Sequence, residues 1–138
     1  MADLLQLEVV TPERLLVREE VSQVMVPGAN GYMGILPDHA PLLSELGVGE
    51  VAYMAQGHKR FMTVVGGFVQ VAGNRVRVLA STAEKADEID VKRAEEALRR
   101  ATGRLEQLPA ALDVARALNA MKRARVRLQC VEHSHAVK

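Results

Sequence analysis

Apolar and polar residues alternate with a period of two through the first half of the chain. Leu5, Leu7 and Val9 alternate with Gln6 and Glu8, which is the pattern of a strand with one buried face. Further short apolar segments follow at 24–26, 61–65, 68–71 and 75–79. Short strands at this spacing, with no helical pattern between them, predict an antiparallel β-sandwich or barrel rather than a parallel sheet with crossover helices.

Glycine, asparagine and proline mark the ends of these strands. Pro27 ends one segment, and the run 28–31 is a turn because Asn and Gly tolerate positive φ. Gly66–Gly67 is expected to separate two strands, and Gly73–Asn74 to form a further turn.

The apolar period changes to that of helices after residue 86. Apolar residues step by three and four through two segments, one before Pro109 and one after it. Asp90 and Asp113 precede the segments and are predicted to cap the helices by accepting backbone N–H groups. Pro109 cannot continue a helix and marks the break. The stepping residues are Val91, Ala94, Leu98, Ala101, Leu105 and Leu108, then Val114, Ala117, Met121, Ala124, Leu128 and Val131.

Two helices of ~16–18 residues with a short connection form an antiparallel hairpin. The predicted fold class is therefore α+β, with a β-sandwich domain over residues 1–86 and a helical hairpin over residues 87–138. A seam of Ala alternating with Leu or Met buries little apolar area. Each Å2 of buried apolar area contributes only ~25 cal/mol of stabilisation, so the hairpin gains little from its own seam. The hairpin therefore needs support from the sandwich, a ligand or another chain, and such a marginal element is a candidate moving part.

Composition narrows the function classes. The 18 basic and 17 acidic residues leave a net charge of +1, which argues against nucleic-acid binding through bulk charge. Aromatic residues at 3% disfavour base stacking. The single cysteine, Cys130, excludes an internal disulfide framework. No apolar run approaches the ~20 residues of a membrane span, and Asp3 interrupts a start that does not resemble a signal peptide.

The histidines form no catalytic constellation. His39 lies in a proline-flanked turn and His58 in a polar turn, while His133 and His135 are expected in a frayed C-terminal tail. No Ser–His–Asp or Cys–His grouping and no phosphate-cradling glycine loop accompanies them. We therefore expect a non-catalytic protein without a metal site.

Arginines of the hairpin define a candidate anion site, because an antiparallel hairpin brings four of them together near Asp90. They are Arg93, Arg100, Arg123 and Arg127. Guanidinium groups pair bidentately with phosphate, and a carboxylate accepts from a ribose hydroxyl or an adenine amine. Two alternatives stay open: a solvated face in which these arginines pair with Glu95 and Glu96, and docking of the basic second helix on an acidic partner.

Four landmarks along nearly the whole chain carry a resemblance to a known family. They are the segments 10–13 (Val-Thr-Pro-Glu), 34–42 (Gly-Ile-Leu-Pro-Asp-His-Ala-Pro-Leu), 66–71 (Gly-Gly-Phe-Val-Gln-Val) and 79–94, which ends in Ile-Asp-Val-Lys-Arg-Ala. In their order and spacing they resemble the epsilon subunits of bacterial-type F-type ATP synthases, called delta in mitochondria. That family has a β-sandwich followed by two helices.

The resemblance implies a non-catalytic rotor (central stalk) subunit of the proton-translocating ATP synthase, peripheral to the cytoplasmic face of the bacterial cell membrane. In the family the sandwich binds the gamma subunit and the c-ring and so couples ring rotation to the gamma shaft. The hairpin either folds on the sandwich, which permits ATP hydrolysis, or extends toward the catalytic alpha and beta subunits, which inhibits it. The basic second helix would contribute Arg116, Lys122, Arg123 and Arg125.

The resemblance also implies a regulatory ATP site, with or without Mg, and no required cofactor. The family's ATP-sensing motif of Ile or Leu, Asp, two variable residues, Arg and Ala maps onto Ile89, Asp90, Arg93 and Ala94. The further contacts map onto Glu84, Arg100, Arg123 and Arg127.

Two turn positions correspond to the family's contact with the c-ring and the gamma shaft. Many members carry an acidic residue after the glycine of the first turn, whereas here Gly31 is followed by Tyr32, so hydrogen bonding and apolar area replace charge. His39 occupies the neighbouring turn, where it either braces the turn or contacts the shaft or ring.

Two rival classes remain. One is a stand-alone small-molecule-binding β-sandwich with a helical lid. The other is a nucleic-acid module that uses the basic helix, which the low aromatic content and near-zero net charge disfavour. Association separates the classes, because a rotor subunit co-purifies with gamma and with membrane-bound ATPase activity.

Overall fold

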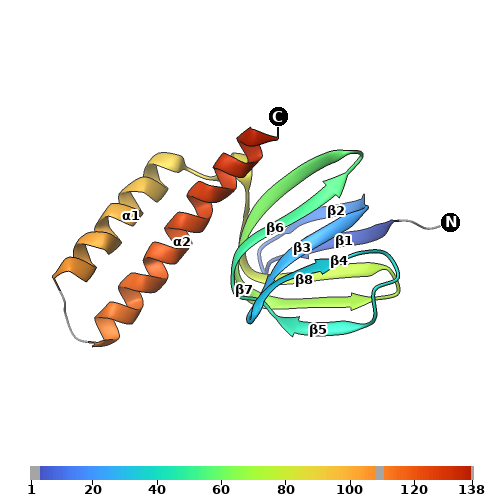
Figure 1. The fold of residues 1–138 in the computed structure, drawn as a ribbon, viewed down its shortest axis with the longest axis horizontal. Coiled ribbons are helices and arrows are strands. Elements are labelled where there is room, and N and C mark those ends of the chain that lie inside the picture. The colour runs from blue at the N-terminus through green and yellow to red at the C-terminus, as the bar shows by residue number, and fades with distance from the viewer. Residues whose placement is uncertain (1–3, 108–110, 138) are drawn as a thin grey trace.

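The computed structural model describes residues 4–107 and 111–137, in which strands come first and two long helices follow (Figure 1). Within these residues there are eight strands, and a short 3-10 helix joins them to the α-helices. The elements are β1 (Leu5–Val10), β2 (Leu15–Val21), β3 (Gln23–Gly28), β4 (Gly31–Ile35), β5 (Leu42–Glu45), β6 (Val48–Ala55), β7 (His58–Ala72), β8 (Arg75–Lys85), η1 (Ala86–Glu88), α1 (Val91–Glu106) and α2 (Ala111–Ala136).

The strands hydrogen-bond in the order β2-β1-β8-β7-β6-β3-β4, and β5 pairs with β7 beside this path. The predicted α+β class, a β-sandwich followed by a helical hairpin, is confirmed. One pair departs from the antiparallel expectation, because β1 and β8 run parallel from Gln6–Arg75 to Val10–Leu79. The chain between these two strands passes through six others, so no tight turn sets their relative direction.

Strand β7 connects the two layers of the sandwich. The prediction of two strands separated by Gly66–Gly67 is wrong, because β7 is one strand of 15 residues that passes through both glycines. Their φ angles are 68° and 113°, and a Cβ on Gly67 would collide with the carbonyl oxygen of Leu79. The bend lets the first part of β7 pair with β6 and the last part with β5, as its curvature in Figure 1 shows.

The sandwich core follows the predicted alternation of apolar and polar positions. Leu5, Leu7 and Val9 on β1 are fully buried, whereas Gln6 is exposed and Glu8 is partly buried. The other strands add alternating aliphatic side chains to the same cluster. Burial of this apolar surface is the main stabilising contribution to the sandwich.

The helices confirm the predicted hairpin, with corrections at the ends of the second one. Asp90 caps α1 as predicted, since its Oδ1 accepts from the Arg93 amide at 3.0 Å. Helix α2 has 26 residues, more than expected, and begins at Ala111. Asp113 therefore lies inside the helix, and the prediction that it caps α2 is wrong. The predicted break at Pro109 lies outside the described residues.

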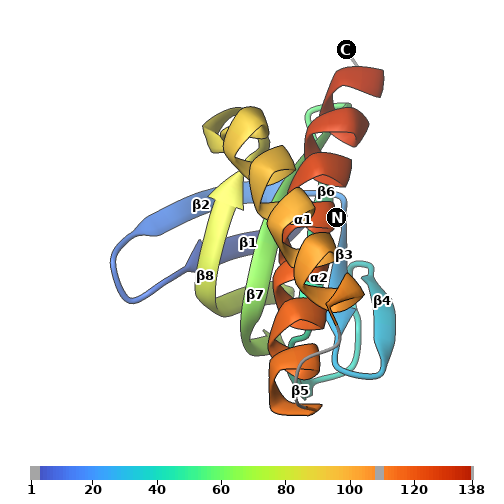
Figure 2. The ribbon, with the colours of Figure 1, turned by 90° about the vertical axis from the view of Figure 1, so that its left-hand side faces the viewer.

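Helix α2 lies between α1 and the sandwich and packs on β6, β7 and η1 (Figures 1 and 2). The prediction that His133 and His135 lie in a frayed tail is wrong, because α2 continues to Ala136. The proposed boundary between residues 86 and 87 falls within η1. A narrow seam of buried alanines joins the two helices: Ala94, Ala101, Ala117 and Ala124.

Candidate functional site

One face of α2 carries three chemically distinct side chains toward the sheet. Arg127, Cys130 and His133 follow one another at intervals of three residues, so they lie on the same side of the helix. Cys130 is completely buried, which shows that this side faces the sandwich rather than solvent.

Three polar residues form a row across the sheet opposite this face. Glu50 on β6 pairs with Thr63 on β7, and Thr63 pairs with Glu84 on β8, so the three side chains point to the same side of the sheet. Thr63 and Glu50 are buried. Glu50, Thr63 and Glu84 are called the acidic row below.

Helix α2 contacts both ends of the acidic row. Arg127 Nε donates to Glu84 Oε1 at 2.6 Å, and about one-third of each side chain is exposed (33% and 34%). His133 Nδ1 lies 2.9 and 3.0 Å from the two carboxylate oxygens of Glu50. Because an ionised carboxylate only accepts hydrogen bonds, the ring nitrogen is the donor. The His133 ring also packs beside Phe61, with centroids 5.5 Å apart.

The buried thiol of Cys130 lies between these two polar contacts. Burial raises its pKa to about 12, and the negative charges of Glu50 and Glu84 add to the shift. Cys130 is therefore protonated and unreactive while α2 is docked.

The structure brings together two of the residues predicted for the nucleotide site. Glu84 and Arg127, on elements far apart in the chain, are paired with each other. The Asp90 carboxylate is engaged as the cap of α1. Ile89 and Ala94 are buried, Ala94 in the seam between the helices. These five positions form a structured junction between the sheet and the hairpin.

The other predicted nucleotide contacts are three arginines of the hairpin. Arg93 and Arg100 are exposed on α1, and Arg123 is partly buried on α2. Among the described residues none of the three pairs with Glu95 or Glu96, although Arg93 and Arg100 do lie on a solvated face, as the alternative interpretation expects. Their guanidinium groups are open to an anion from solution.

The two turn positions predicted to contact the c-ring and the shaft lie at opposite ends of β4. Tyr32 follows Gly31 at the start of β4 and is exposed, but its hydroxyl accepts from the Glu50 amide at 3.1 Å. The hydroxyl also lies over Gly49, where a Cβ would collide with it. His39 follows the end of β4, and its Nδ1 lies 2.7 Å from the carbonyl oxygen of the next residue. Tyr32 thus ties the start of β4 to β6, whereas the His39 contact stays within its own turn.

The basic residues predicted to meet acidic subunits are accessible on α2. Arg116, Lys122 and Arg125 are exposed and Arg123 is partly buried. The described helices include none that is both long and apolar enough to cross a membrane.

A bidentate ion pair holds the junction between the sandwich and the hairpin. Arg14, in the β1–β2 connection, donates from Nη1 and Nη2 to the two carboxylate oxygens of Glu88 in η1, at 2.6 and 2.9 Å. The Arg14 guanidinium lowers the pKa of Glu88 to about 2, with a further contribution from the Lys85 amide. This pair ties the start of the helical part to the sandwich.

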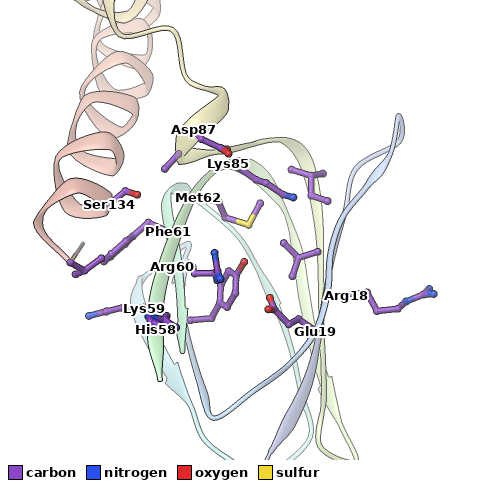
Figure 3. A pocket seen from close by; sticks show the side chains of 15 residues that line it. Arg18, Glu19, His58, Lys59, Arg60, Phe61, Met62, Lys85, Asp87 and Ser134 are labelled. Carbon is purple, nitrogen blue, oxygen red and sulfur yellow. The ribbon is translucent and has the colours of Figure 1, made fainter. Parts of the chain in front are cut away.

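An open cavity of about 940 Å3 lies at the edge of the sandwich, near the end of α2. Its floor includes the buried side chains of Tyr53 and Met62. Figure 3 shows Glu19, Arg60 and Lys85 pointing into the cavity. None of the site residues predicted from the sequence lines it.

Sequence reasoning missed Glu50 and placed His133 in a tail. The three-residue spacing of Arg127, Cys130 and His133 was the signal for a shared helix face. No local signal identifies Glu50, because it meets His133 across 83 positions of the chain.

The structure thus defines a two-part protein, a β-sandwich with a helical hairpin packed on one of its faces. The family model described as ATP synthase, Delta/Epsilon chain, beta-sandwich domain matches residues 4–86. The model described as ATP synthase, Delta/Epsilon chain, long alpha-helix domain matches residues 87–132. The chain belongs to the ATP synthase delta/epsilon chain family, and it is a structural rather than a catalytic subunit.

Two relatives that match over most of the chain agree with this assignment. The ATP synthase epsilon chain of Solibacter usitatus is 52% identical over 128 residues, which cover 93% of this chain and 96% of the relative. That of Nitratidesulfovibrio vulgaris is 45% identical over 125 residues, which cover 91% and 93%.

Two mitochondrial structures share the fold. A chain of the Euglena gracilis ATP synthase (OSCP/F1/c-ring) matches with a TM-score of 0.71 at 22% identity, covering 99% of this chain and 82% of that chain. A chain of the Tetrahymena thermophila ATP synthase central stalk and c-ring matches with a TM-score of 0.66 at 13% identity, covering 92% and 96%.

Proposed function

We propose that this chain is a central-stalk subunit of a bacterial F-type ATP synthase, peripheral to the cytoplasmic face of the cell membrane. Its sandwich binds the gamma subunit and the c-ring, and its hairpin regulates ATP hydrolysis. The support for this proposal is the epsilon-chain relatives at high coverage and a shared fold with a chain from a central stalk and c-ring structure.

The outer face of the sandwich supports binding of a protein partner. Phe68 on β7 pairs with Leu79 on β8, Leu79 with Val10 on β1, and Val10 with Leu15 on β2. Phe68, Leu79 and Leu15 are 51%, 43% and 46% exposed. An apolar row across four strands, left open to solvent, is typical of a surface that another protein covers. We assign this row to the gamma shaft and the Tyr32 and His39 turns to the c-ring or shaft.

The hairpin's separate packing is the observation that carries the regulatory part of the proposal. The buried seam of α1 and α2 consists of alanines and lies outside the apolar core of the sandwich. Polar contacts of α2 with the acidic row, together with the buried side chains of Val126 and Cys130, attach α2 to the sandwich. A docked position held in this way differs from an extended one by a free energy that a ligand or a neighbouring subunit can overcome.

The regulatory proposal is tested in the assembled enzyme. Neutralising the basic set on α2 should raise ATP hydrolysis, because the extended hairpin loses its attraction to acidic surface of the catalytic subunits. The set is Arg116, Lys122, Arg123 and Arg125. A matched control neutralises exposed basic residues of α1, Lys92, Arg99 and Arg104, and should leave hydrolysis unchanged. Equal hydrolysis by the wild-type and the α2 variant would refute an inhibitory role for α2.

We also propose that the hairpin junction binds ATP as a regulatory ligand. Arg93, Arg100 and Arg123 offer guanidinium groups to the phosphates, and the Glu84–Arg127 pair closes the junction beside Asp90. Calorimetry of the full chain with Mg-ATP should show heat that Arg93→Gln reduces and Arg99→Gln, a control on the same helix, does not. No heat at millimolar nucleotide would contradict ATP binding.

A further inference from the structure

One of the two polar contacts that attach α2 to the sheet is made by a histidine, whose ring carries a charge only when it is protonated. We propose that His133 and Glu50 form a pH-dependent latch that holds the hairpin on the sandwich more tightly as the pH falls from about 8 to about 5. The latch deepens the regulatory function proposed above and rests on it, because it acts on the docked position of the hairpin.

The geometry favours an ion pair when the ring is protonated. His133 Nδ1 lies within 3.0 Å of both carboxylate oxygens of Glu50. The Glu50 side chain is only 11% exposed, and its backbone is held in β6 and by the Tyr32 hydroxyl. The carboxylate is therefore fixed in place. The His133 side chain is 52% exposed, so its ring exchanges protons with solvent while α2 stays docked.

The surrounding charges leave Glu50 as the dominant partner of the ring. Lys59 on β7 lies over the Phe61 ring at 5.5 Å from its centroid, Asp87 lies on η1, and Glu132 precedes His133 on α2. Only Glu50 contacts the imidazole directly among the charged groups that the structure describes. Protonation therefore converts a hydrogen bond into a charge-assisted one and strengthens docking.

The second contact of α2 provides a pH-independent reference. Arg127 stays protonated throughout this range, so its bond to Glu84 persists while the His133 contact weakens. The two contacts flank Cys130, the single cysteine of the chain. Lifting α2 from the acidic row exposes the thiol, which makes its reactivity a direct measure of docking.

The test measures the rate of Cys130 modification by a thiol reagent in the full chain across pH 5 to 8. Each rate is normalised to that of the same variant in concentrated denaturant, which removes the pH dependence of the thiol itself. In the wild-type chain we expect protection to increase about two- to fivefold toward low pH. His133→Gln and Glu50→Gln should each abolish this increase.

Two matched variants keep the measurement specific. His135→Gln changes an exposed histidine of the same helix and should retain the full increase. Glu84→Gln should lower protection at every pH but retain the increase. Circular dichroism confirms that each variant is folded. An increase that persists in both His133→Gln and Glu50→Gln would overturn the latch.

The latch and the regulatory function fail in different experiments. If the isolated wild-type chain shows no increase in Cys130 protection toward low pH, the latch is refuted and the regulatory function is not affected. Hydrolysis that does not respond to the basic residues of α2 in the assembled enzyme bears on the regulatory function alone.

Discussion

The ion pair between Arg14 and Glu88 joins η1, which precedes the hairpin, to the sandwich. Its hydrogen bonds hold the pKa of Glu88 at about 2, against an ordinary value of 4.5. For a carboxylate with a lowered pKa, the stabilisation is present above pH 4.5 and is lost as the pH falls toward 2. The whole shift corresponds to about 3 kcal/mol. Because the Arg14 and Glu88 side chains are 47% and 34% exposed, solvent screening reduces the expected value to about 1 kcal/mol.

Glu88→Gln removes this charge while keeping the shape of the side chain. We expect it to lower the free energy of unfolding by about 1 kcal/mol at pH 7, and by progressively less as the pH approaches 2. Urea denaturation of the full wild-type and Glu88→Gln chains, at pH 7 and at a pH close to 2, measures the difference in the free energy of unfolding. Glu95→Gln, an exposed position on α1 without an ion pair among the described residues, is the control and should change nothing. An equal loss at both pH values would refute the electrostatic explanation.

Four further substitutions test backbone strain, packing and one hydrogen bond. Gly67→Ala should lower the free energy of unfolding by about 2 kcal/mol or more, because it combines strain with a collision against β8. Gly57→Ala, at a φ of 77° with open space around it, should cost only about 1 kcal/mol in the same urea titration. Tyr32→Phe should cost about 1 kcal/mol by removing the acceptor for a main-chain amide of β6. Ala101→Leu should overpack the seam and lower the free energy of unfolding by about 1–3 kcal/mol, whereas an unchanged value in the urea titration would contradict a tight seam.

Local physical chemistry explains what was predictable from the sequence. The alternation at Leu5, Leu7 and Val9 identifies a strand because side chains of an extended chain point to opposite faces. The cap at Asp90 is equally local, since the carboxylate accepts from an amide only three residues away. The helix seam follows from the spacing of residues on one face. For these features the sequence and the structure agree.

Features that depend on distant partners were not predictable in this way. The parallel pairing of β1 with β8 joins the two ends of the sandwich, and nothing within either strand encodes it. Gly66–Gly67 suggests a break, yet pairing with β8 along its length keeps β7 continuous. His133 becomes a docked residue only because Glu50 lies opposite, in a strand 83 positions earlier.

The packing of α2 also constrains which protein surface could bind the hairpin in its extended position. Besides the polar contacts, Val126 and Cys130 are buried on faces of α2 outside the alanine seam. Each buried aliphatic side chain is worth about 1.5–3 kcal/mol when removed from water. This exceeds the gain from an exposed ion pair, at about 0.2–1 kcal/mol. An extended hairpin that met only acidic side chains would therefore lose more by exposing Val126 and Cys130 than its basic residues could regain. The receiving surface should combine acidic groups with an apolar patch that covers these two residues.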